Sequence, residues 1–261
     1  MTGASRHLSG QGNGGAGPAV RAPVKDISAG RSLYPATSPW PPIACGIAVI
    51  LLALVLAGVV GAIVDRYPFA IDRTIIEGLR QWAGPAGLRG AAVNLTSLGS
   101  VAVLTLVVVG VAGLLFVQRL WLTALTTILA CWSGGWAVTL VKSHVARPRP
   151  DLVPHWVDVV NTSFPSGHAA GSATVYLTMA ALASEVVRGR AARRYILAVA
   201  VLLVGAIGVS RVYLGVHWPT DVLAGWCFGT LWALGWWIAT AGARRSLARA
   251  LPETERPNAG G

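Results

Sequence analysis

Residues 43–64 read IACGIAVILLALVLAGVVGAIV, which is 22 residues without a charged side chain. About 20 such residues cross the hydrocarbon core of a bilayer as one helix. Five more charge-free runs follow, of 27, 22, 16, 16 and 22 residues, at 91–117, 120–141, 169–184, 195–210 and 222–243. The two short runs reach spanning length only by including polar residues such as His168 or Arg211 at one end. The pattern predicts an all-α membrane protein with six transmembrane helices.

The composition agrees with a membrane protein. Of the 261 residues, 54% are hydrophobic and 12% are charged, and the mean hydropathy is +0.60. Soluble domains carry about 25% charged residues, so these values exclude a soluble globular enzyme and a disordered chain. The three cysteines, Cys45, Cys131 and Cys227, lie in or beside apolar runs without motif spacing, and we interpret them as small hydrophobic residues.

Three parts are expected along the chain. Residues 1–40 are rich in Gly, Ser, Ala and Pro and predict a disordered basic tail without a cleavable signal. Residues 43–243 form the membrane domain, and residues 244–261 form a C-terminal tail. The loop at 65–90 predicts a short helix on the membrane surface, or else a helix that caps the bundle without touching substrate. No internal repeat of the kind found in many transporters is visible.

The basic residues indicate the orientation. The formal net charge is +11, but the Lys and Arg residues lie mainly between the apolar runs, so a nucleic-acid partner is not expected. With the N-terminus in the cytoplasm, 13 Lys and Arg residues fall inside and 8 outside. Four of those eight lie in the chemical clusters described next. Because Lys and Arg gather in cytoplasmic loops, both termini are predicted to be cytoplasmic.

Three polar clusters stand at the ends of predicted spans. They read KSHVARPRP at 142–150, PSGH at 165–168 and SRVYLGVHWPTD at 210–221. The first cluster lies at the end of the third span, the second lies at the start of the fourth span, and the third connects the fifth span to the sixth. Six alternating spans place all three clusters on the same side of the membrane and at the same depth.

The first two clusters suit anion binding. Pro148 and Pro150 stiffen the loop that carries Arg149, which lowers the entropy lost on positioning its guanidinium group. Ser166 suits an N-cap, with Gly167 and His168 in the first helical turn, where free N–H groups and the helix dipole attract an anion. A basic membrane anchor and an ordinary helix start are the plainer alternatives.

The third cluster suits nucleophilic catalysis. His217 and Asp221 are four residues apart, so we expect them on one helical face. A carboxylate bonded to one ring nitrogen leaves the other nitrogen free to act as nucleophile or base. A structural His–Asp pair at a helix end is the alternative.

Together the clusters favour phosphoryl transfer. Lys142, Arg149 and Arg211 supply three cations that neutralise phosphoryl oxygens, while one histidine attacks and the other protonates the leaving oxygen. A two-metal phosphatase needs several clustered carboxylates. The loops on the predicted outer side of this core offer only Asp151, Asp158 and Asp221, so neither a metal nor another cofactor is expected.

These motifs resemble the signature of the type 2 phosphatidic acid phosphatase superfamily, which includes vanadium haloperoxidases and glucose-6-phosphatase. The pattern is Lys, six residues, Arg-Pro; then Pro-Ser-Gly-His; then Ser-Arg, five residues, His, three residues, Asp. Every position is filled, by Lys142, Arg149, Pro150, Pro165, Ser166, Gly167, His168, Ser210, Arg211, His217 and Asp221. Ile71-Asp72 and residues 96–100 also resemble the family's approach to the second span, so the resemblance covers roughly 65–237.

The resemblance implies a six-helix bundle in the plasma membrane with its active site on the extracytoplasmic face. His217 would form a phosphohistidine, Asp221 would orient it, and His168 would act as acid and then base. Lys142, Arg149, Ser166, the Gly167 amide and Arg211 would hold the phosphoryl oxygens. The expected substrate is a lipid phosphate: polyprenyl diphosphate, phosphatidic acid or phosphatidylglycerol phosphate, with a polyprenyl diphosphate or a glycerophospholipid phosphate favoured.

Some alternatives stay open at this point. A catalytically inert lipid-phosphate binding or transport protein is the second hypothesis for the function.

Some residues and properties are also left open. Arg147 suits either binding of a second phosphate or head group, or a membrane anchor, and His144 suits a structural role. No role is assigned to His155, and neither the oligomeric state nor the regulation is predicted. The tryptophans of the last span are expected to serve packing and the membrane interface: Trp226, Trp232, Trp236 and Trp237.

Overall fold

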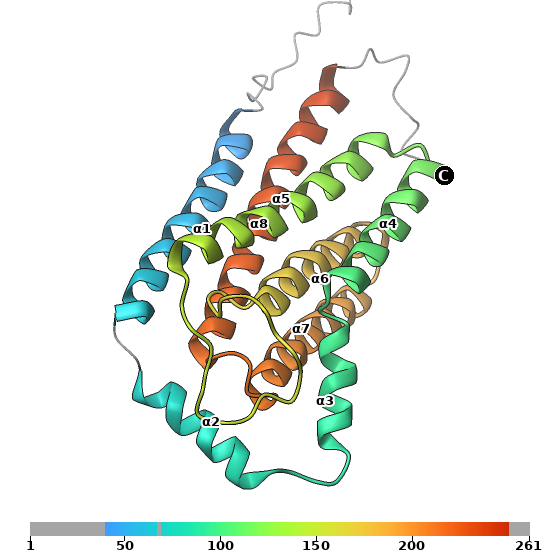
Figure 1. Ribbon diagram of the computed structural model, residues 1–261. Coiled ribbons are helices and arrows are strands. Elements are labelled where there is room, and N and C mark those ends of the chain that lie inside the picture. Colours follow the sequence, from blue (N-terminus) through green and yellow to red (C-terminus); the bar gives the residue numbers. More distant parts are fainter. Residues whose placement is uncertain (1–39, 67–68, 251–261) are drawn as a thin grey trace, which may run out of the picture. The chain divides into compact units, whose positions relative to one another are not determined.

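The computed structural model describes residues 40–66 and 69–250, with side chains up to residue 244. Within this part of the chain every regular element is a helix, which confirms the all-α class. The helices are α1 (Trp40–Arg66), α2 (Ala70–Trp82), α3 (Leu88–Ser97), α4 (Val101–Val117), α5 (Trp121–Val145), α6 (Gly167–Val186), α7 (Arg190–Tyr213) and α8 (Pro219–Ala250) (Figure 1). Apart from Trp40, the predicted tail at 1–40 lies outside the described residues, as do residues 251–261.

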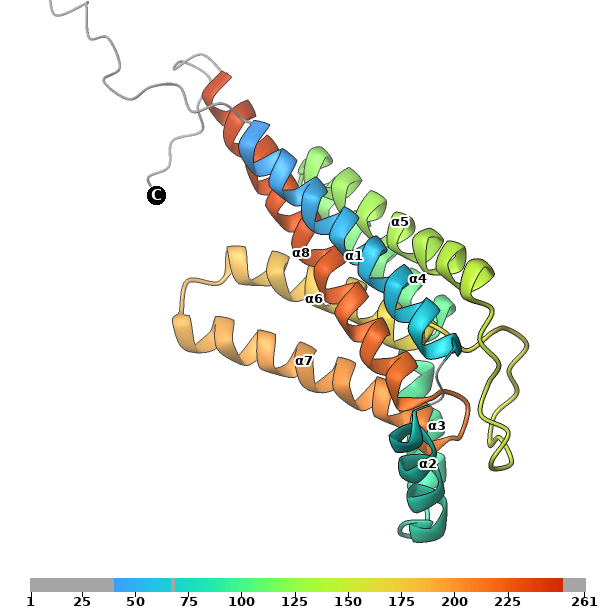
Figure 2. The same ribbon diagram turned by 90° about the vertical axis from the view of Figure 1, so that its left-hand side faces the viewer.

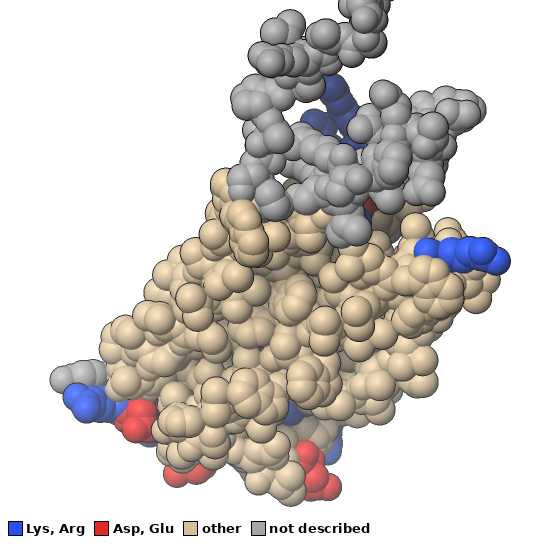
Figure 3. All heavy atoms as spheres, turned by 90° about the horizontal axis from the view of Figure 1, so that it is seen from above, with Lys and Arg blue, Asp and Glu red and all other residues tan. Residues whose placement is uncertain are grey.

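Among the described residues, four helices are long and apolar enough to cross a membrane: α1, α5, α7 and the part of α8 at Pro219–Arg244. α3 and α4 pass the same test together, although they are bent by 47°. α6 has 20 residues and is not among these helices. Figure 3 shows a broad face without Lys, Arg, Asp or Glu and with charged residues at its margins. An integral membrane protein is supported, and the count of six spans stays a prediction.

α6 is enclosed by other helices, since it packs against α4, α5, α7 and α8. Its buried residues are all small or β-branched: Ala169, Ala170, Ser172, Ala173, Thr174, Val175 and Ala180. A Cβ atom at Gly225 would lie 2.8 Å from the carbonyl oxygen of Ser166, and one at Gly229 would meet the carbonyl oxygen of Ala170. Small residues therefore let α8 approach the first turns of α6 closely, which brings the second and third polar clusters together.

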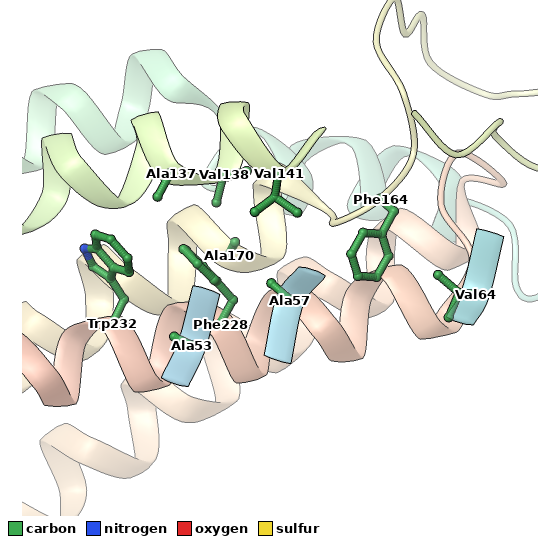
Figure 4. Close-up of a cluster of buried hydrophobic side chains, with 10 residues drawn as sticks. All are labelled: Ala53, Ala57, Val64, Ala137, Val138, Val141, Phe164, Ala170, Phe228 and Trp232. Carbon is green, nitrogen blue, oxygen red and sulfur yellow. The ribbon is translucent and has the colours of Figure 1, made fainter. Parts of the chain in front are cut away.

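The largest buried apolar cluster joins α1, α5, α6 and α8. Figure 4 shows the rings of Phe228 and Trp232 from α8 among small side chains of α1 and α5. The two rings are stacked, with centroids 5.2 Å apart. Phe164, three residues before α6, is fully buried in the same cluster and fixes the connection that leads to the second motif.

The predicted run at 91–117 is divided by a break between α3 and α4. Ser100 caps α4 by accepting a hydrogen bond from the backbone N–H of Val103. The Tyr176 hydroxyl of α6 donates to the carbonyl oxygen of Leu98, with an O···O distance of 2.7 Å. The break is therefore stabilised by side-chain hydrogen bonds, and it directs the end of α3 toward α6 and α7.

α2 is the helix expected in the first outer loop. Asp72 and Ile76 are buried, whereas Ile71 and Trp82 are exposed. Figures 1 and 2 show α2, α3, the α5–α6 connection and the α7–α8 connection at the same end of the helices. The location of α2 on a membrane surface stays a prediction, but its buried face packs on α7 and α8.

Candidate active site

The three polar clusters meet at the end of the bundle where α2 and α3 lie. The first cluster spans the end of α5 and the following connection, the second begins α6, and the third joins α7 to α8. Six of the eight predicted site residues line a single cavity of about 1250 Å³: Lys142, Arg149, Gly167, His168, Arg211 and His217. The parity of the predicted spans had indicated that these clusters converge, and the structure brings them together.

His217 lies in the short connection before α8 and is only 2% exposed. The Arg149 guanidinium donates to its Nε2 atom, with an N···N distance of 3.2 Å. An arginine can only donate, so Nε2 carries the lone pair and Nδ1 carries the proton. Burial, together with the nearby Arg149 and Arg211 charges, lowers the pKa of His217 to about 4, against the opposing effect of Asp221. At neutral pH the ring is therefore uncharged and suited to act as a nucleophile.

The contact between His217 and Asp221 differs from the expected one. His217 precedes α8 instead of sharing a helical face with Asp221, and its Nδ1 atom is 3.6 Å from Asp221 Oδ2. That distance is too long for a good hydrogen bond. The Ser163 hydroxyl donates to Asp221 Oδ2 and lies 3.4 Å from His217 Nδ1. A serine that precedes the second motif thus connects the imidazole to the carboxylate.

Asp221 is fully buried and has several donors. Besides Ser163, the backbone N–H of Trp218 donates to its Oδ2 at 3.0 Å. Arg147 donates from Nη1 to Asp221 Oδ1 at 2.6 Å and from Nη2 to Asp72 Oδ2 at 3.1 Å. Arg147 is 4% exposed and is not among the residues that line the cavity. Neither a head-group contact nor a membrane anchor, the two expectations for Arg147, matches this position.

The second motif begins α6 as expected. The Ser166 side chain accepts a hydrogen bond from the backbone N–H of Ala169, so Ser166 is the predicted N-cap. Ser166 is fully buried and does not line the cavity, in contrast to Gly167 and His168. A Cβ atom at Gly99 would lie 3.2 Å from Cδ2 of His168, so the break between α3 and α4 packs against this ring.

The three predicted cations approach the cavity from different elements. Lys142 Nζ donates to the carbonyl oxygen of Thr162 at 2.7 Å. Arg149 Nε donates to the carbonyl oxygen of Asn161 at 2.6 Å. Burial lowers the pKa of Arg149, but an arginine side chain stays charged at neutral pH.

Arg211 carries a buried donor that has no acceptor among the described residues. Its Nη1 atom donates to the Thr96 hydroxyl of α3 at 3.0 Å. Its Nε atom is buried and has no hydrogen-bond partner among the described residues. Such a buried donor is costly unless a ligand or water pairs with it. Arg211 itself lines the cavity beside two histidines and two further cations.

Away from these polar groups the cavity continues as an apolar groove between α4, α5 and α6. Its lining includes Val101, Leu104, Val108, Ala112 and Phe116 of α4, Ile128, Cys131, Trp132 and Gly135 of α5, and Gly171 of α6. Trp132 is 68% exposed, so the groove opens sideways between the helices. From Val101 to Phe116 the helical rise is roughly 22 Å.

Several residues lie away from this cavity. His144 contacts the carbonyl oxygen of Leu140, and His155 contacts that of Pro150. In the described part of the chain, none of the four α8 tryptophans lines the cavity, and Trp226 and Trp232 donate to backbone carbonyls of α7 and α5. Within the same residues no three His, Cys, Asp or Glu side chains gather where they could hold a metal ion.

Sequence reasoning missed Ser163 and Thr96 and did not connect Asp72 to the site. Asp72 and Thr96 lie in segments that resemble the family but carry no motif of their own. Ser163 stands two residues before Pro165, and no spacing rule links it to His217, which is 54 positions later. Only the folded arrangement brings these residues together.

Comparisons with known proteins agree with the geometry. A family model described as the PAP2 superfamily matches residues 119–245. Phosphatidylglycerophosphatase B of Bacillus subtilis is 34% identical over 140 residues, which is 53% of this chain and 68% of that protein. Decaprenylphosphoryl-5-phosphoribose phosphatase of Mycobacterium tuberculosis is 35% identical over 113 residues, 42% of this chain and 56% of that protein.

A solved structure is similar as well. The crystal structure of a transmembrane PAP2-type phosphatidylglycerolphosphate phosphatase from Bacillus subtilis matches with a TM-score of 0.61 and 25% identity. The match covers 77% of this chain and 96% of that one. The chain therefore belongs to the PAP2 superfamily, as a membrane-spanning member of its lipid phosphatases.

Proposed function

We propose that this protein hydrolyses the terminal phosphate of a phosphomonoester or diphosphate lipid, with the phosphate in the polar cavity and the tail in the apolar groove. The observation that carries this proposal is the convergence of three cations, Lys142, Arg149 and Arg211, with both motif histidines on one cavity. A tetrahedral anion in this cavity meets three cations at once.

In the proposed mechanism, Nε2 of His217 attacks the phosphorus atom. Arg149 donates to that nitrogen, so its guanidinium must turn to the phosphoryl oxygens when substrate binds. The bond from phosphorus to the leaving oxygen breaks as the bond to Nε2 forms, and His168, in its protonated form beside the bound phosphate, gives the leaving oxygen its proton. His168 then removes a proton from water, which attacks the phosphohistidine and releases phosphate. No step requires a metal ion or a cofactor.

Five further residues hold the phosphate or support the nucleophile. Lys142, Arg211 and the backbone N–H of Gly167 bind the phosphoryl oxygens at the N-terminus of α6. Ser166 acts through the cap, because its hydroxyl is engaged with Ala169. Asp221 stabilises the charge that develops on the His217 ring as the phosphorus–nitrogen bond forms.

The groove favours a lipid whose apolar chain begins close to the phosphate. Its wall along α4 rises by roughly 22 Å, more than the roughly 15 Å of hydrocarbon in one leaflet. A long polyprenyl chain fits this depth, and acyl chains fit its upper part. The matched relatives are named for a phosphatidylglycerol phosphate and for a decaprenyl lipid. We therefore favour polyprenyl diphosphate and phosphatidylglycerol phosphate over phosphatidic acid.

The proposal includes an orientation in the plasma membrane. With six spans, counting α6 as the enclosed one and α3 and α4 together as another, both termini lie on one side of the membrane and the cavity lies at the other; we infer that the termini are cytoplasmic and the cavity is extracytoplasmic. The distribution of Lys and Arg supports this orientation. α2 then lies at the outer interface, with its exposed apolar side chains toward the lipid.

The test is phosphate release by the full-length protein in detergent micelles with a chelator present. The substrates are polyprenyl diphosphate, phosphatidic acid and phosphatidylglycerol phosphate. We expect release that survives the chelator and falls by a factor on the order of 10³ or more in His217→Ala. His144→Ala, which removes an exposed histidine outside the cavity, is the matched control and should keep activity.

Two results would contradict this proposal. Release that depends on added metal would exclude the metal-independent mechanism, and release that persists in His217→Ala would exclude the nucleophile. Absence of release from every lipid, with binding retained in His217→Ala, would instead favour a lipid-phosphate binding protein.

A further inference from the structure

Arg147 occupies an unusual position between two buried carboxylates. Its Nη1 atom donates to Asp221 Oδ1 at 2.6 Å and to the Thr220 hydroxyl at 2.9 Å, and its Nη2 atom donates to Asp72 Oδ2 at 3.1 Å. The side chains of Arg147, Asp72 and Asp221 are at most 5% exposed. Buried charges of this kind persist only when they are paired and hydrogen-bonded.

Asp72 binds Thr220 as well as Arg147. Its Oδ1 atom accepts from the backbone N–H of Thr220 at 3.0 Å, and its Oδ2 atom accepts from the Thr220 hydroxyl at 2.6 Å. Thr220 immediately precedes Asp221 at the start of α8. The carboxylate of α2 thus holds both the first turn of α8 and the guanidinium group that contacts Asp221.

We propose that Arg147, held by Asp72, is a positioning residue that orients Asp221 and sets the negative charge which Asp221 presents to His217. Arg147 acts through Asp221, because it does not line the cavity. The inference rests on the proposed role of His217 as nucleophile. It makes α2, the helix of the first outer loop, part of the catalytic apparatus.

Loss of the Arg147 or the Asp72 charge is expected to shift the pKa of His217 in a defined direction. His217 is surrounded by Asp221 of α8, Arg149 of the α5–α6 connection, Arg211 of α7 and His168 of α6, with Lys142 of α5 on the same cavity. Asp221 raises the pKa of His217, while burial and the arginines lower it to about 4. Loss of the positive charge of Arg147 leaves Asp221 less neutralised, so the pKa of His217 rises. Loss of the negative charge of Asp72 has the opposite sign.

The pH dependence of kcat/KM tests this sign directly, because its acid limb reports the free enzyme's essential base. Protonated His217 cannot attack, so wild-type activity should fall as the pH drops through about 4. In Arg147→Gln we expect the limb at higher pH, with kcat lower by a factor on the order of 10² and KM nearly unchanged. In Asp72→Asn we expect a limb at lower pH and a smaller loss of kcat, and the double variant should lie between the two.

Two further variants separate positioning from general stability. Arg147→Lys keeps the charge but not the three hydrogen bonds. The acid limb of its kcat/KM profile should therefore lie at the wild-type pH, while its kcat falls. Arg80→Gln removes a half-buried arginine that contacts Trp156 and the Pro154 carbonyl instead of Asp221, and its limb should not move. Folding of each variant is checked by gel filtration in detergent.

An Arg147→Gln enzyme that is folded and has the wild-type limb would overturn the proposal. So would an Asp72→Asn enzyme with wild-type kcat and profile, or one whose limb moves to higher pH. If Arg147→Gln does not fold, the Asp72→Asn and Arg147→Lys results decide. Failure of the proposed function is a separate outcome, since it requires that wild type releases no phosphate or that His217→Ala retains activity.

Discussion

The two sides of His217 differ in how completely their polar groups are paired. On the Asp221 side, the carboxylate accepts from Ser163, from the Trp218 N–H and from Arg147. On the cavity side, the buried Nε of Arg211 has no partner among the described residues. A fully paired network holds a fixed geometry, whereas the three cations on the other side, Lys142, Arg149 and Arg211, line the cavity. We propose that the first side positions the nucleophile and that the second side binds the substrate.

The largest effect is expected on the cavity side. Arg211→Gln removes the charge and the unpaired donor, so kcat/KM for phosphate release should fall by a factor on the order of 10²–10³. Arg194→Gln, at the exposed opposite end of α7, makes the same chemical change far from the cavity and should leave kcat/KM unchanged. Equal kcat/KM values for the two variants would show that Arg211 does not bind the phosphate.

A smaller effect is expected on the paired side. Ser163→Ala removes the hydroxyl between His217 and Asp221 and should lower kcat about tenfold, with little change in KM. The matched control is Ser172→Ala, another buried serine, whose hydroxyl donates to the Ala169 carbonyl in its own helix. A similar loss of kcat in both variants would mean that Ser163 serves packing and not the nucleophile.

The smallest effect concerns the groove. A Cβ atom at Gly135 meets no atom within 4 Å, so Gly135→Leu fits the fold and fills the groove instead. KM for a long-chain lipid phosphate should rise several-fold, while hydrolysis of a short, water-soluble phosphate ester should not change. Gly110→Leu is the control, because Gly110 is equally unobstructed but does not line the groove. The groove assignment fails if both variants give the same KM for the long-chain lipid.

The sequence predicted the helical class and the meeting of the three clusters because both depend on simple rules. Apolar runs of spanning length form helices in a membrane, and the parity of spans fixes which ends share a side. The count of spans depends on α6, whose small buried residues reflect its enclosure by other helices. That enclosure is a tertiary property, and hydropathy alone does not report it.

The details around Asp221 could not be predicted for a related reason. Arg147 and Asp72 are 75 positions apart, and Ser163 and Asp221 are 58 apart. Their contacts depend on the packing of α2 and the α5–α6 connection against the start of α8. A spacing of four residues suggested a direct bond from His217 to Asp221, but α8 begins only at Pro219, after His217.

The central claim is that His217 becomes covalently phosphorylated. Its most direct test is rapid quenching of a reaction between the wild-type protein and a lipid that carries ³²P in its terminal phosphate. We expect label on the peptide that contains His217, stable in base and lost in acid as for a phosphorus–nitrogen bond, and absent from His217→Ala. Phosphate release without any labelled protein, or label that persists in His217→Ala, would contradict the account.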